Sequence, residues 1–227
     1  MNDKSHASED PAPPAHPVGA TSPDAPMPCG TGVPPVDLCK VEDCVAPAGL
    51  RIALATAADA ELVSAMVHEL AEFEKLSQEC AMTADAVRQH LMGPRRSADA
   101  LIAWEGQEPA GFAVYYRTFS TFVARPGVFL EDLFVRPAFR HRGIGRALLR
   151  EVGRIAHRAG AGRYEWTTLK WNTNARRLYG AIGAREMDEW LLLRMDAAAL
   201  ARFACDGNGK PHDGCRCGGA GPGHRTD

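Results

Sequence analysis

The sequence lacks any apolar run of membrane-spanning length, and residues 1–6 lack the charged-then-apolar pattern of a secretory signal. These absences predict a cytoplasmic protein with no membrane partner. A charge excess is also missing, because 26 Lys and Arg residues stand against 28 Asp and Glu residues, for a formal net charge of −2. Nucleic-acid-binding domains are usually strongly basic, so no nucleic-acid partner is expected.

Cysteine is nearly absent from the middle of the chain, where only Cys80 of the seven cysteines lies between residues 49 and 204. The other six are Cys29, Cys39, Cys44, Cys205, Cys215 and Cys217. Thiols placed mainly toward the chain ends fit a reducing compartment better than a disulfide framework. His212 lies close to Cys215 and Cys217, but the spacing matches no standard zinc pattern, so no metal is expected.

Large apolar residues are scarce in residues 1–48, which instead contain 10 of the 16 prolines. A segment of this composition cannot bury enough apolar surface to offset the entropy lost on ordering. Residues 205–227 contain seven glycines and few large apolar side chains. We therefore expect a disordered Pro-rich tail over 1–48, one folded domain over 49–204 and a flexible Gly-rich tail over 205–227. The expected domain has 21 basic and 18 acidic residues, a balance that suits an anionic cofactor.

Hydrophobic periodicity over residues 49–204 predicts a mixed α/β fold with the order β-α-α-β-β-β-α-β-α-β. Three consecutive strands before a crossover helix favour a central mixed, mostly antiparallel sheet flanked by helices. Thr56 and Asp59 resemble a capping box, and Thr83 is a candidate cap of the second helix. Strands are expected at 51–56, 100–104, 111–116, 128–135, 164–169 and 190–195, and helices near 59–73, 83–91, 143–159, 174–182 and 197–203.

A glycine-containing turn, Arg140-His-Arg-Gly143-Ile-Gly145-Arg146, separates the expected strand 128–135 from the helix 143–159. Glycines at such a turn let backbone N–H groups approach a phosphate, and the helix N-terminus adds a partial positive charge. The turn therefore predicts a pyrophosphate site. A dinucleotide oxidoreductase is not favoured, because Leu148 occupies the position of the third glycine of that fingerprint and three meander strands precede the turn.

Two signatures in this order resemble the GNAT acetyltransferase superfamily over about residues 50–204. The first is Arg140-His-Arg-Gly143-Ile-Gly145, and the second is Asn172-Thr-Asn-Ala175-Arg-Arg-Leu178-Tyr179-Gly-Ala-Ile-Gly183. Three further segments look like the spermidine/spermine (diamine) acetyltransferase family, and the first of them resembles its thialysine-acetylating branch. These segments are Glu69-Leu-Ala-Glu-Phe-Glu-Lys-Leu76, Leu130-Glu-Asp-Leu-Phe-Val135, and Trp171-Asn172 with Tyr179.

The resemblance implies a GNAT fold, acetyl-CoA as co-substrate and a homodimer. Backbone groups of the strand before the turn would bind the pantetheine arm, and the turn would bind the pyrophosphate. Asn172 would hold the pantetheine near Tyr179, although an ordinary helix cap is the alternative for this residue. The implied acetyl-CoA site comprises Leu133, Phe134, Val135, Arg140, His141, Arg142, Gly143, Ile144, Gly145, Arg146, Asn172 and Ala175.

Acetyl transfer to an amine requires a base, because an alkylamine with a pKa of about 10.4 is neutral only about once in 2,500 molecules at pH 7. Glu131 is the candidate base, and Asp132 the candidate ligand of the amine. Strand alternation places the two carboxylates on opposite faces unless a bulge rotates one, and the resemblance implies such a distortion. The alternative is a solvated strand carboxylate or one paired with an arginine. Tyr179 is the candidate acid toward the thiolate, with a core aromatic as the alternative.

The expected acceptor is a primary amine of a small diamine, short polyamine or thialysine-like amino acid. Phe73, Glu74 and Trp190 match substrate-pocket positions of the diamine family, while Phe73 also fits a helix core stripe and Trp190 fits strand packing. Two other functions remain open at this point. One is a protein or peptide amino-group acetyltransferase of the same superfamily, and the other is a non-catalytic acyl-CoA sensor.

Overall fold

A computed structural model describes residues 49–204 of the chain. The expectations for the two tails, including His212 and six of the cysteines, concern residues outside this range. Within it the chain divides into two compact units, one ending at Arg163 and the other beginning at Tyr164. Among the described residues, no helix is both long and apolar enough to cross a membrane.

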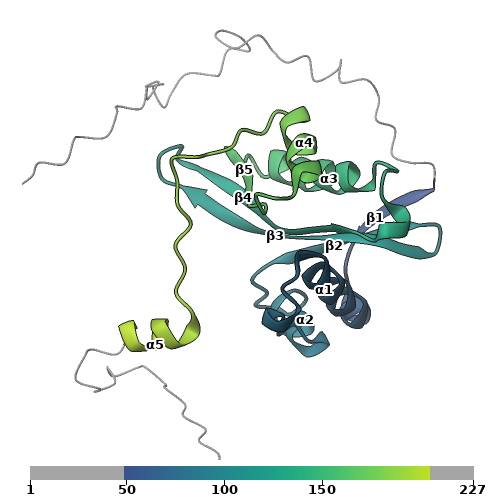
Figure 1. Ribbon diagram of the computed structural model, residues 1–227, viewed down its shortest axis with the longest axis horizontal. Helices are drawn as coiled ribbons and strands as arrows, with labels where there is room; N and C mark the ends of the chain where they lie inside the picture. The colour runs from purple at the N-terminus through teal and green to yellow at the C-terminus, as the bar shows by residue number, and fades with distance from the viewer. Residues whose placement is uncertain (1–48, 205–227) are drawn as a thin grey trace, which may run out of the picture. The chain divides into compact units, whose positions relative to one another are not determined.

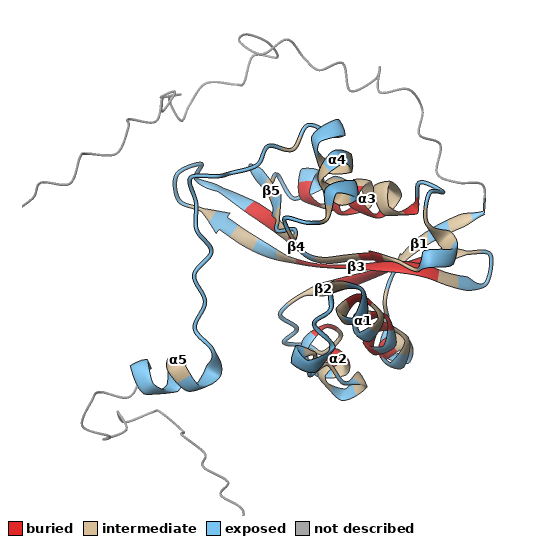
Figure 2. Ribbon diagram, in the orientation of Figure 1, coloured by how far each residue is buried: buried red, intermediate tan, exposed pale blue. Residues whose placement is uncertain are grey.

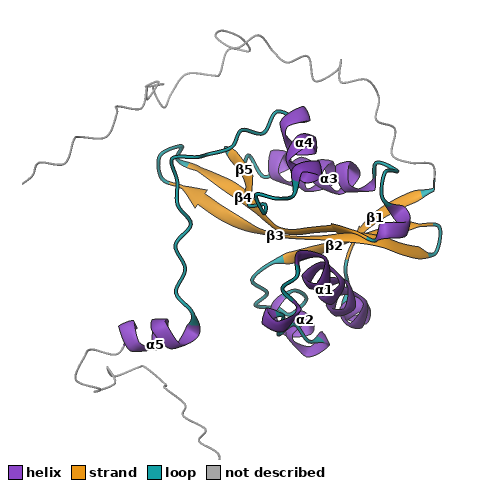
Figure 3. Ribbon diagram, viewed as in Figure 1, coloured by secondary structure: helices purple, strands orange, loops and turns teal. Residues whose placement is uncertain are grey.

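The first unit is built on an antiparallel meander whose strands pair in chain order (Figures 1 and 3). Near the start of β3 (Glu108–Ser120) and the end of β4 (Arg125–Val135), these two strands lie very close together. A Cβ on Gly111 would lie 2.4 Å from the Phe134 carbonyl oxygen. Only glycine fits there. The strands are β1 (Leu50–Leu54), β2 (Asp99–Glu105), β3 (Glu108–Ser120) and β4 (Arg125–Val135).

Helices cover both faces of this meander (Figure 1), with α1 (Ala60–Glu74) and α2 (Ala84–His90) on one face and α3 (Ile144–Arg158) on the other. The helix expected at 143–159 is confirmed as α3, and its apolar stripe packs on the sheet, because Ile144, Leu148 and Val152 are fully buried. Figure 2 shows the buried residues between the helices and the sheet. Under α1 and α2 the core comprises Ala60, Val63, Met66, Leu70, Val87, Leu91, Ala100, Ile102, Phe112, Val114 and Phe134.

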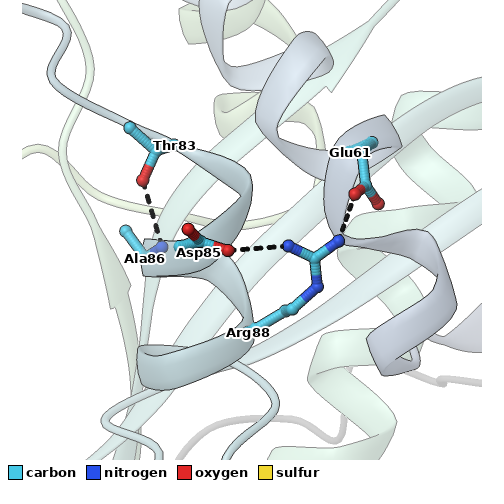
Figure 4. Close-up of polar contacts among 5 residues, drawn as sticks. All are labelled: Glu61, Thr83, Asp85, Ala86 and Arg88. Carbon is cyan, nitrogen blue, oxygen red and sulfur yellow. Dashed lines mark hydrogen bonds and ion pairs between the residues drawn. The ribbon is translucent and has the colours of Figure 1, made fainter.

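Polar contacts at the helix starts follow the sequence. The Asp59 carboxylate accepts hydrogen bonds from the backbone N and Oγ1 of Thr56, at 2.8 and 2.7 Å, in a short 3-10 turn before α1. Thr83 caps α2 by accepting from the backbone N of Ala86 at 3.1 Å. Arg88 of α2 then binds Asp85 at 2.9 Å and also Glu61 of α1 (Figure 4). Both expected caps are confirmed, and an ion pair joins the two helices.

The second unit contains β5 from Tyr164 onward (Arg163–Trp166), α4 (Thr173–Ala181) and α5 (Ala197–Ala204). Gly183, at φ 90°, ends α4 as expected. The strand expected at residues 190–195 is wrong, because this stretch has no regular secondary structure. A strand requires a hydrogen-bonded partner, and the described part of the chain supplies none to residues 191–195. The rest of the expected element order is confirmed.

Candidate active site

A β-bulge in β4 lies at the expected position. Val114 of β3 pairs with Asp132, whereas the next residue, Tyr115, pairs with Leu130. Glu131 is therefore the extra residue and has no partner in the register. Bulges of this kind redirect side chains and are frequent beside active sites. The distortion implied by the family resemblance is confirmed.

The bulge sends Asp132 to the side of the sheet that faces α1. Asp132 pairs with Val114, and Phe134 pairs with Phe112, and these three apolar residues all belong to the core beneath α1 and α2. Leu130 pairs with Tyr115 on the opposite face. In a regular strand Leu130 and Asp132, two residues apart, would share a face. The extra residue thus separates them and directs Asp132 toward the helix that ends in Glu74.

Three carboxyl groups influence one another at this place. The pKa of Asp132 is raised to about 6, first by burial and then by the negative charges of Glu131 and Glu74. Burial also raises the pKa of Glu74, whereas Glu131 is exposed. Like charges in a partly desolvated site disfavour ionisation, and a bound cation relieves that cost. The arrangement is suited to an ammonium group.

The last turn of α1 contributes the two other pocket residues expected in this unit. Phe73 is 37% exposed and its ring centroid lies 6.5 Å from that of Phe134, so it lies at the rim of the core. Glu74 follows it directly and is half-buried. Lys75, at φ 63°, then ends the helix in the left-handed region, and Leu76 N donates to Ala71 O at 2.8 Å. This turn places Phe73 and Glu74 at the sheet face that carries Asp132.

The glycine turn has the backbone geometry of an anion site. His141 and Gly143 both have positive φ, at 63° and 78°, and α3 begins directly afterwards at Ile144. Within the described residues, no backbone N–H from 141 to 146 donates a hydrogen bond to a protein acceptor. Successive free N–H groups at a helix N-terminus bind phosphate oxygens well. The residues present therefore fit a pyrophosphate, as in the coenzyme A moiety.

The three arginines of this turn differ in their surroundings. Arg142 contacts Glu105 at 2.5 Å and lies over the Phe139 ring, and Arg140 donates to the carbonyl oxygen of Val135. Arg146 forms no ion pair with any described residue and is half-buried. Of the three expected phosphate ligands, Arg146 is the one whose guanidinium has no hydrogen bond or ion pair to a described residue.

The strand before the turn offers mainly its backbone. Phe134 is 4% exposed and belongs to the core, so its side chain is unavailable to a ligand. The side chain of Ile144, 1% exposed, is buried in the same way. Leu133 and Val135 are half-buried. A ligand at these positions would meet peptide groups, which is how the resemblance assigns them.

In the second unit the Asn172–Gly183 signature forms a capped helix. The Asn172 side chain accepts from the backbone N of Ala175 at 3.2 Å, so the alternative of a helix cap is observed. Tyr179 of α4 makes an edge contact with Trp166, at 5.1 Å between ring centroids. Burial raises the pKa of the nearby Tyr164, and Tyr179 contributes in the same direction. Trp190 is 68% exposed and lies in a stretch without regular secondary structure.

Sequence reasoning missed Arg136, which follows β4 directly. Its guanidinium binds both carboxylate oxygens of Glu69, with its shortest contact at 2.6 Å, and donates to the carbonyl oxygen of Pro109 at 3.0 Å. Glu69 begins the segment that resembles the thialysine branch. The signal in the sequence was an acid, Glu69, on the helix expected at 59–73, and a basic residue, Arg136, directly after the strand expected at 128–135.

Comparison with known proteins identifies the family. Residues 63–184 match the model of the Acetyltransferase (GNAT) family, which is more than half of the chain. The chain belongs to the GNAT acetyltransferase family. It is an acetyl-CoA-dependent N-acetyltransferase, and the expected mixed α/β GNAT fold is confirmed.

Individual GNAT relatives agree with this placement. A thialysine N-epsilon-acetyltransferase from Caenorhabditis elegans is 36% identical over 157 residues, covering 68% of this chain and 96% of the relative. One from Mus musculus is 32% identical over 168 residues, covering 69% and 98%. Among solved structures, an integron cassette protein from V. cholerae has the same fold, with a TM-score of 0.59 at 23% identity, covering 69% of this chain and 98% of that one.

Proposed function

We propose that this GNAT enzyme acetylates a primary amine of a small diamine, short polyamine or thialysine-like amino acid. The observation that carries the proposal is the carboxyl cluster of Glu74, Glu131 and Asp132 at the bulge of β4. A cation at this cluster would favour ionisation of all three groups. The two thialysine N-epsilon-acetyltransferases at 36% and 32% identity support an amino group on a flexible side chain as acceptor.

In the proposed reaction Asp132 holds the ammonium, and Glu131 accepts its proton directly or through water. General base assistance of this kind is typically worth about 10²–10⁴-fold in rate. The neutral amine then attacks the thioester carbonyl of acetyl-CoA. As the C–N bond forms and the C–S bond breaks, Tyr179 donates its phenolic proton to the departing thiolate. The nitrogen then loses its second proton through water to the Tyr179 phenolate, which gives the amide, free CoA and a restored phenol. Phenol and thiol have similar pKa values, about 10 and 8.5, so the proton transfer between them costs little free energy.

The proposed acetyl-CoA site is the glycine turn and the strand before it. Backbone N–H groups of residues 141–146 would bind the pyrophosphate, and Arg146 would add a positive charge. Peptide groups of Leu133 and Val135 would bind the pantetheine arm. Since the Asn172 side chain caps α4, its contribution to the cofactor would come through that helix start rather than through a free amide group.

A mass-spectrometric screen tests the proposal. The full chain is incubated with acetyl-CoA and a panel of a diamine, a short polyamine, thialysine and a peptide with a free N-terminus. We expect a single acetyl group on a primary amine of at least one small molecule. Acetylation of the peptide alone would support the protein acetyltransferase instead, and CoA binding without any turnover would support the sensor.

Matched variants test the residue roles in the same assay. Glu131→Gln and Tyr179→Phe are each expected to lower kcat/KM by about 10²-fold or more. The control is Glu79→Gln, which changes an exposed carboxylate outside the site. Unchanged turnover in both site variants would contradict the assigned roles.

We also infer a homodimer, and the exposed apolar stretch of the second unit supports it. Trp190, Leu191, Leu192, Leu193 and Met195 are between 56% and 86% exposed. Contiguous apolar surface of this kind marks an interaction site. Light scattering on the full chain should give twice the 24.5 kDa mass of one copy, and Leu192→Glu should reduce it. A single-copy mass over the micromolar range would contradict the dimer.

A further inference from the structure

The side chain of Arg140 contacts the end of β4 and the last turn of α1. Its Nε donates to the carbonyl oxygen of Val135 at 2.9 Å, at the end of β4. Its guanidinium carbon lies 4.5 Å from the centroid of the Phe73 ring and 5.6 Å from that of Phe134. A guanidinium over two aromatic faces is held by cation–π attraction as well as by its hydrogen bond. The hydrogen bond therefore fixes the position of Nε, and the aromatic rings fix the orientation of the guanidinium plane.

The contacts of Arg140 join three parts of the molecule. Its backbone begins the turn that supplies N–H groups 141–146, and its Nε holds the carbonyl at the end of β4. Its guanidinium covers Phe73 in the last turn of α1. Phe73 directly precedes Glu74, whose charge acts on Asp132. One side chain thus contacts both the expected acetyl-CoA side and the expected amine side.

Arg140 joins two segments, the last turn of α1 and the turn at His141, whose backbone conformations are unfavourable or easily opened on their own. The last turn of α1 ends at Lys75, which has φ 63°, and helix ends open more easily than helix centres. The next residue after Arg140, His141, also has positive φ without being glycine, a conformation that persists only when its surroundings impose it. A contact between the two fixes both.

We propose that Arg140 is a positioning residue that couples the amine pocket on α1 to the acetyl-CoA turn, and not a ligand of the phosphates. This inference rests on the function proposed above. Binding of CoA at the turn would then order the last turn of α1, and with it Phe73 and Glu74. The charge of Arg140 matters less in this role than its planar shape, because a lysine cannot stack on Phe73 and bind Val135 O in the same way.

Hydrogen exchange tests the coupling without requiring any amine. Addition of CoA to the wild-type chain should slow amide exchange in a peptide covering residues 70–76. In Arg140→Lys, CoA should still bind, and this protection should be lost. Arg96→Lys is the matched control, since Arg96 likewise donates through Nε, here to the Asp99 carboxylate at 2.6 Å, but lies outside the site. It should behave as the wild type.

Kinetics supply the second readout. Arg140→Lys should raise the KM of the amine about fivefold, even though the positive charge is kept. This factor corresponds to the loss of one cation–π contact worth about 1 kcal/mol. Phe73→Leu should do the same, and the double variant should be no worse than either single one. A phosphate ligand would instead give a raised KM for acetyl-CoA alone in Arg140→Ala, and Arg140→Lys, which keeps the charge, would restore it.

The outcomes separate the two proposals. CoA binding by the wild type without any response of residues 70–76 would overturn the coupling alone. An unaltered amine KM in Arg140→Lys, together with a raised acetyl-CoA KM in Arg140→Ala, would also overturn it and make Arg140 a phosphate ligand. Failure of the wild-type chain to bind CoA would overturn the proposed function together with the coupling.

Discussion

Arg136 and Glu69 join the end of β4 to α1 through a two-pronged ion pair, with N–O distances of 2.6 and 2.9 Å. Both side chains are partly buried. The helix that carries Phe73 and Glu74 is thereby attached to the strand that carries Glu131 and Asp132. Bidentate arginine–carboxylate pairs fix relative orientation as well as adding energy. We expect the distance between the proposed amine pocket and the bulge to depend on this pair.

Glu69→Gln should therefore weaken both the fold and the site. Removal of one partner leaves Arg136 incompletely paired, which we expect to lower the free energy of unfolding by about 1–3 kcal/mol, less than for a fully buried pair. The amine KM should rise as well, since α1 loses its attachment. Urea unfolding and steady-state kinetics measure the two effects. Glu72→Gln, on the exposed side of α1, is the control, and equal behaviour of the two variants would contradict the assignment.

The two glycines of the turn should differ in their effect on stability. Gly143 has φ 78°, so Gly143→Ala should cost about 1 kcal/mol of unfolding free energy. Gly145 lies in the first turn of α3, and a Cβ there would meet only Val135 Cγ2 at 3.6 Å, an ordinary contact. Gly145→Ala should leave the protein as stable as the wild type or slightly more so. Thermal unfolding distinguishes them, and the opposite order would be evidence against this geometry.

The raised pKa of Asp132 gives a stability prediction with a definite sign. Below its usual pKa, near 3.8, the carboxyl is protonated in both folded and unfolded chains. As the pH rises to about 6 the unfolded state loses the proton first, so the fold is destabilised, and above about 6 the full cost remains. Asp132→Asn should thus stabilise the fold by roughly 1–3 kcal/mol at pH 7.5 and by much less near pH 3.5. Chemical unfolding at both pH values checks this, and a destabilised variant at pH 7.5 would refute it.

The same group should shape the pH dependence of catalysis. Below a pH of about 6 Asp132 takes up a proton and loses the charge that is proposed to hold the ammonium, so kcat/KM for the amine should fall. In Asp132→Asn the activity should be lower at neutral pH, and the fall centred near pH 6 should be gone. A pH profile of kcat/KM with both proteins measures this. Persistence of that limb in the variant would assign it to another group.

Lys75 offers a stabilising change close to the pocket. Its φ of 63° is the left-handed conformation of a helix C-terminus, which glycine adopts without the steric cost paid by other residues. Lys75→Gly should raise the unfolding free energy by up to about 1 kcal/mol. Lys75→Ala, which keeps a Cβ, should bring no such gain. Equal stability of the glycine and alanine variants would argue against the left-handed conformation in solution.

Most helices and strands could be predicted from the sequence, because short local patterns matched the observed helix ends and the observed burial. The apolar stripe of α3, the caps Thr83 and Asp59, and the stop at Gly183 all act over a few residues. The stretch 190–195 failed because its composition favours a strand, while strand formation depends on a partner that the described chain does not supply. A hydrophobic pattern predicts which side chains will be buried, but it does not predict which element packs against them.

In the site, the sequence suggested candidate residues for the chemistry but did not show how their side chains are held. The bulge at Glu131 was expected from the family resemblance, because strict alternation alone gives regular pairing. Arg140, Arg142 and Arg146 look equivalent in sequence, yet one lies on Phe73, one pairs with Glu105, and one forms no ion pair with a described residue. Those differences arise from residues distant along the chain, which spacing within the turn does not reveal.

The register of β4 has a consequence for how this site relates to its scaffold. If Glu131 were omitted, Leu130 would keep its face, Asp132 and Phe134 would keep theirs, and the alternation between the two cores would run unbroken. The sheet therefore does not need Glu131 for its own architecture. The proposed catalytic carboxylate is a one-residue insertion into an otherwise complete strand, so the chemistry could be gained or lost at this position while both hydrophobic cores stay intact.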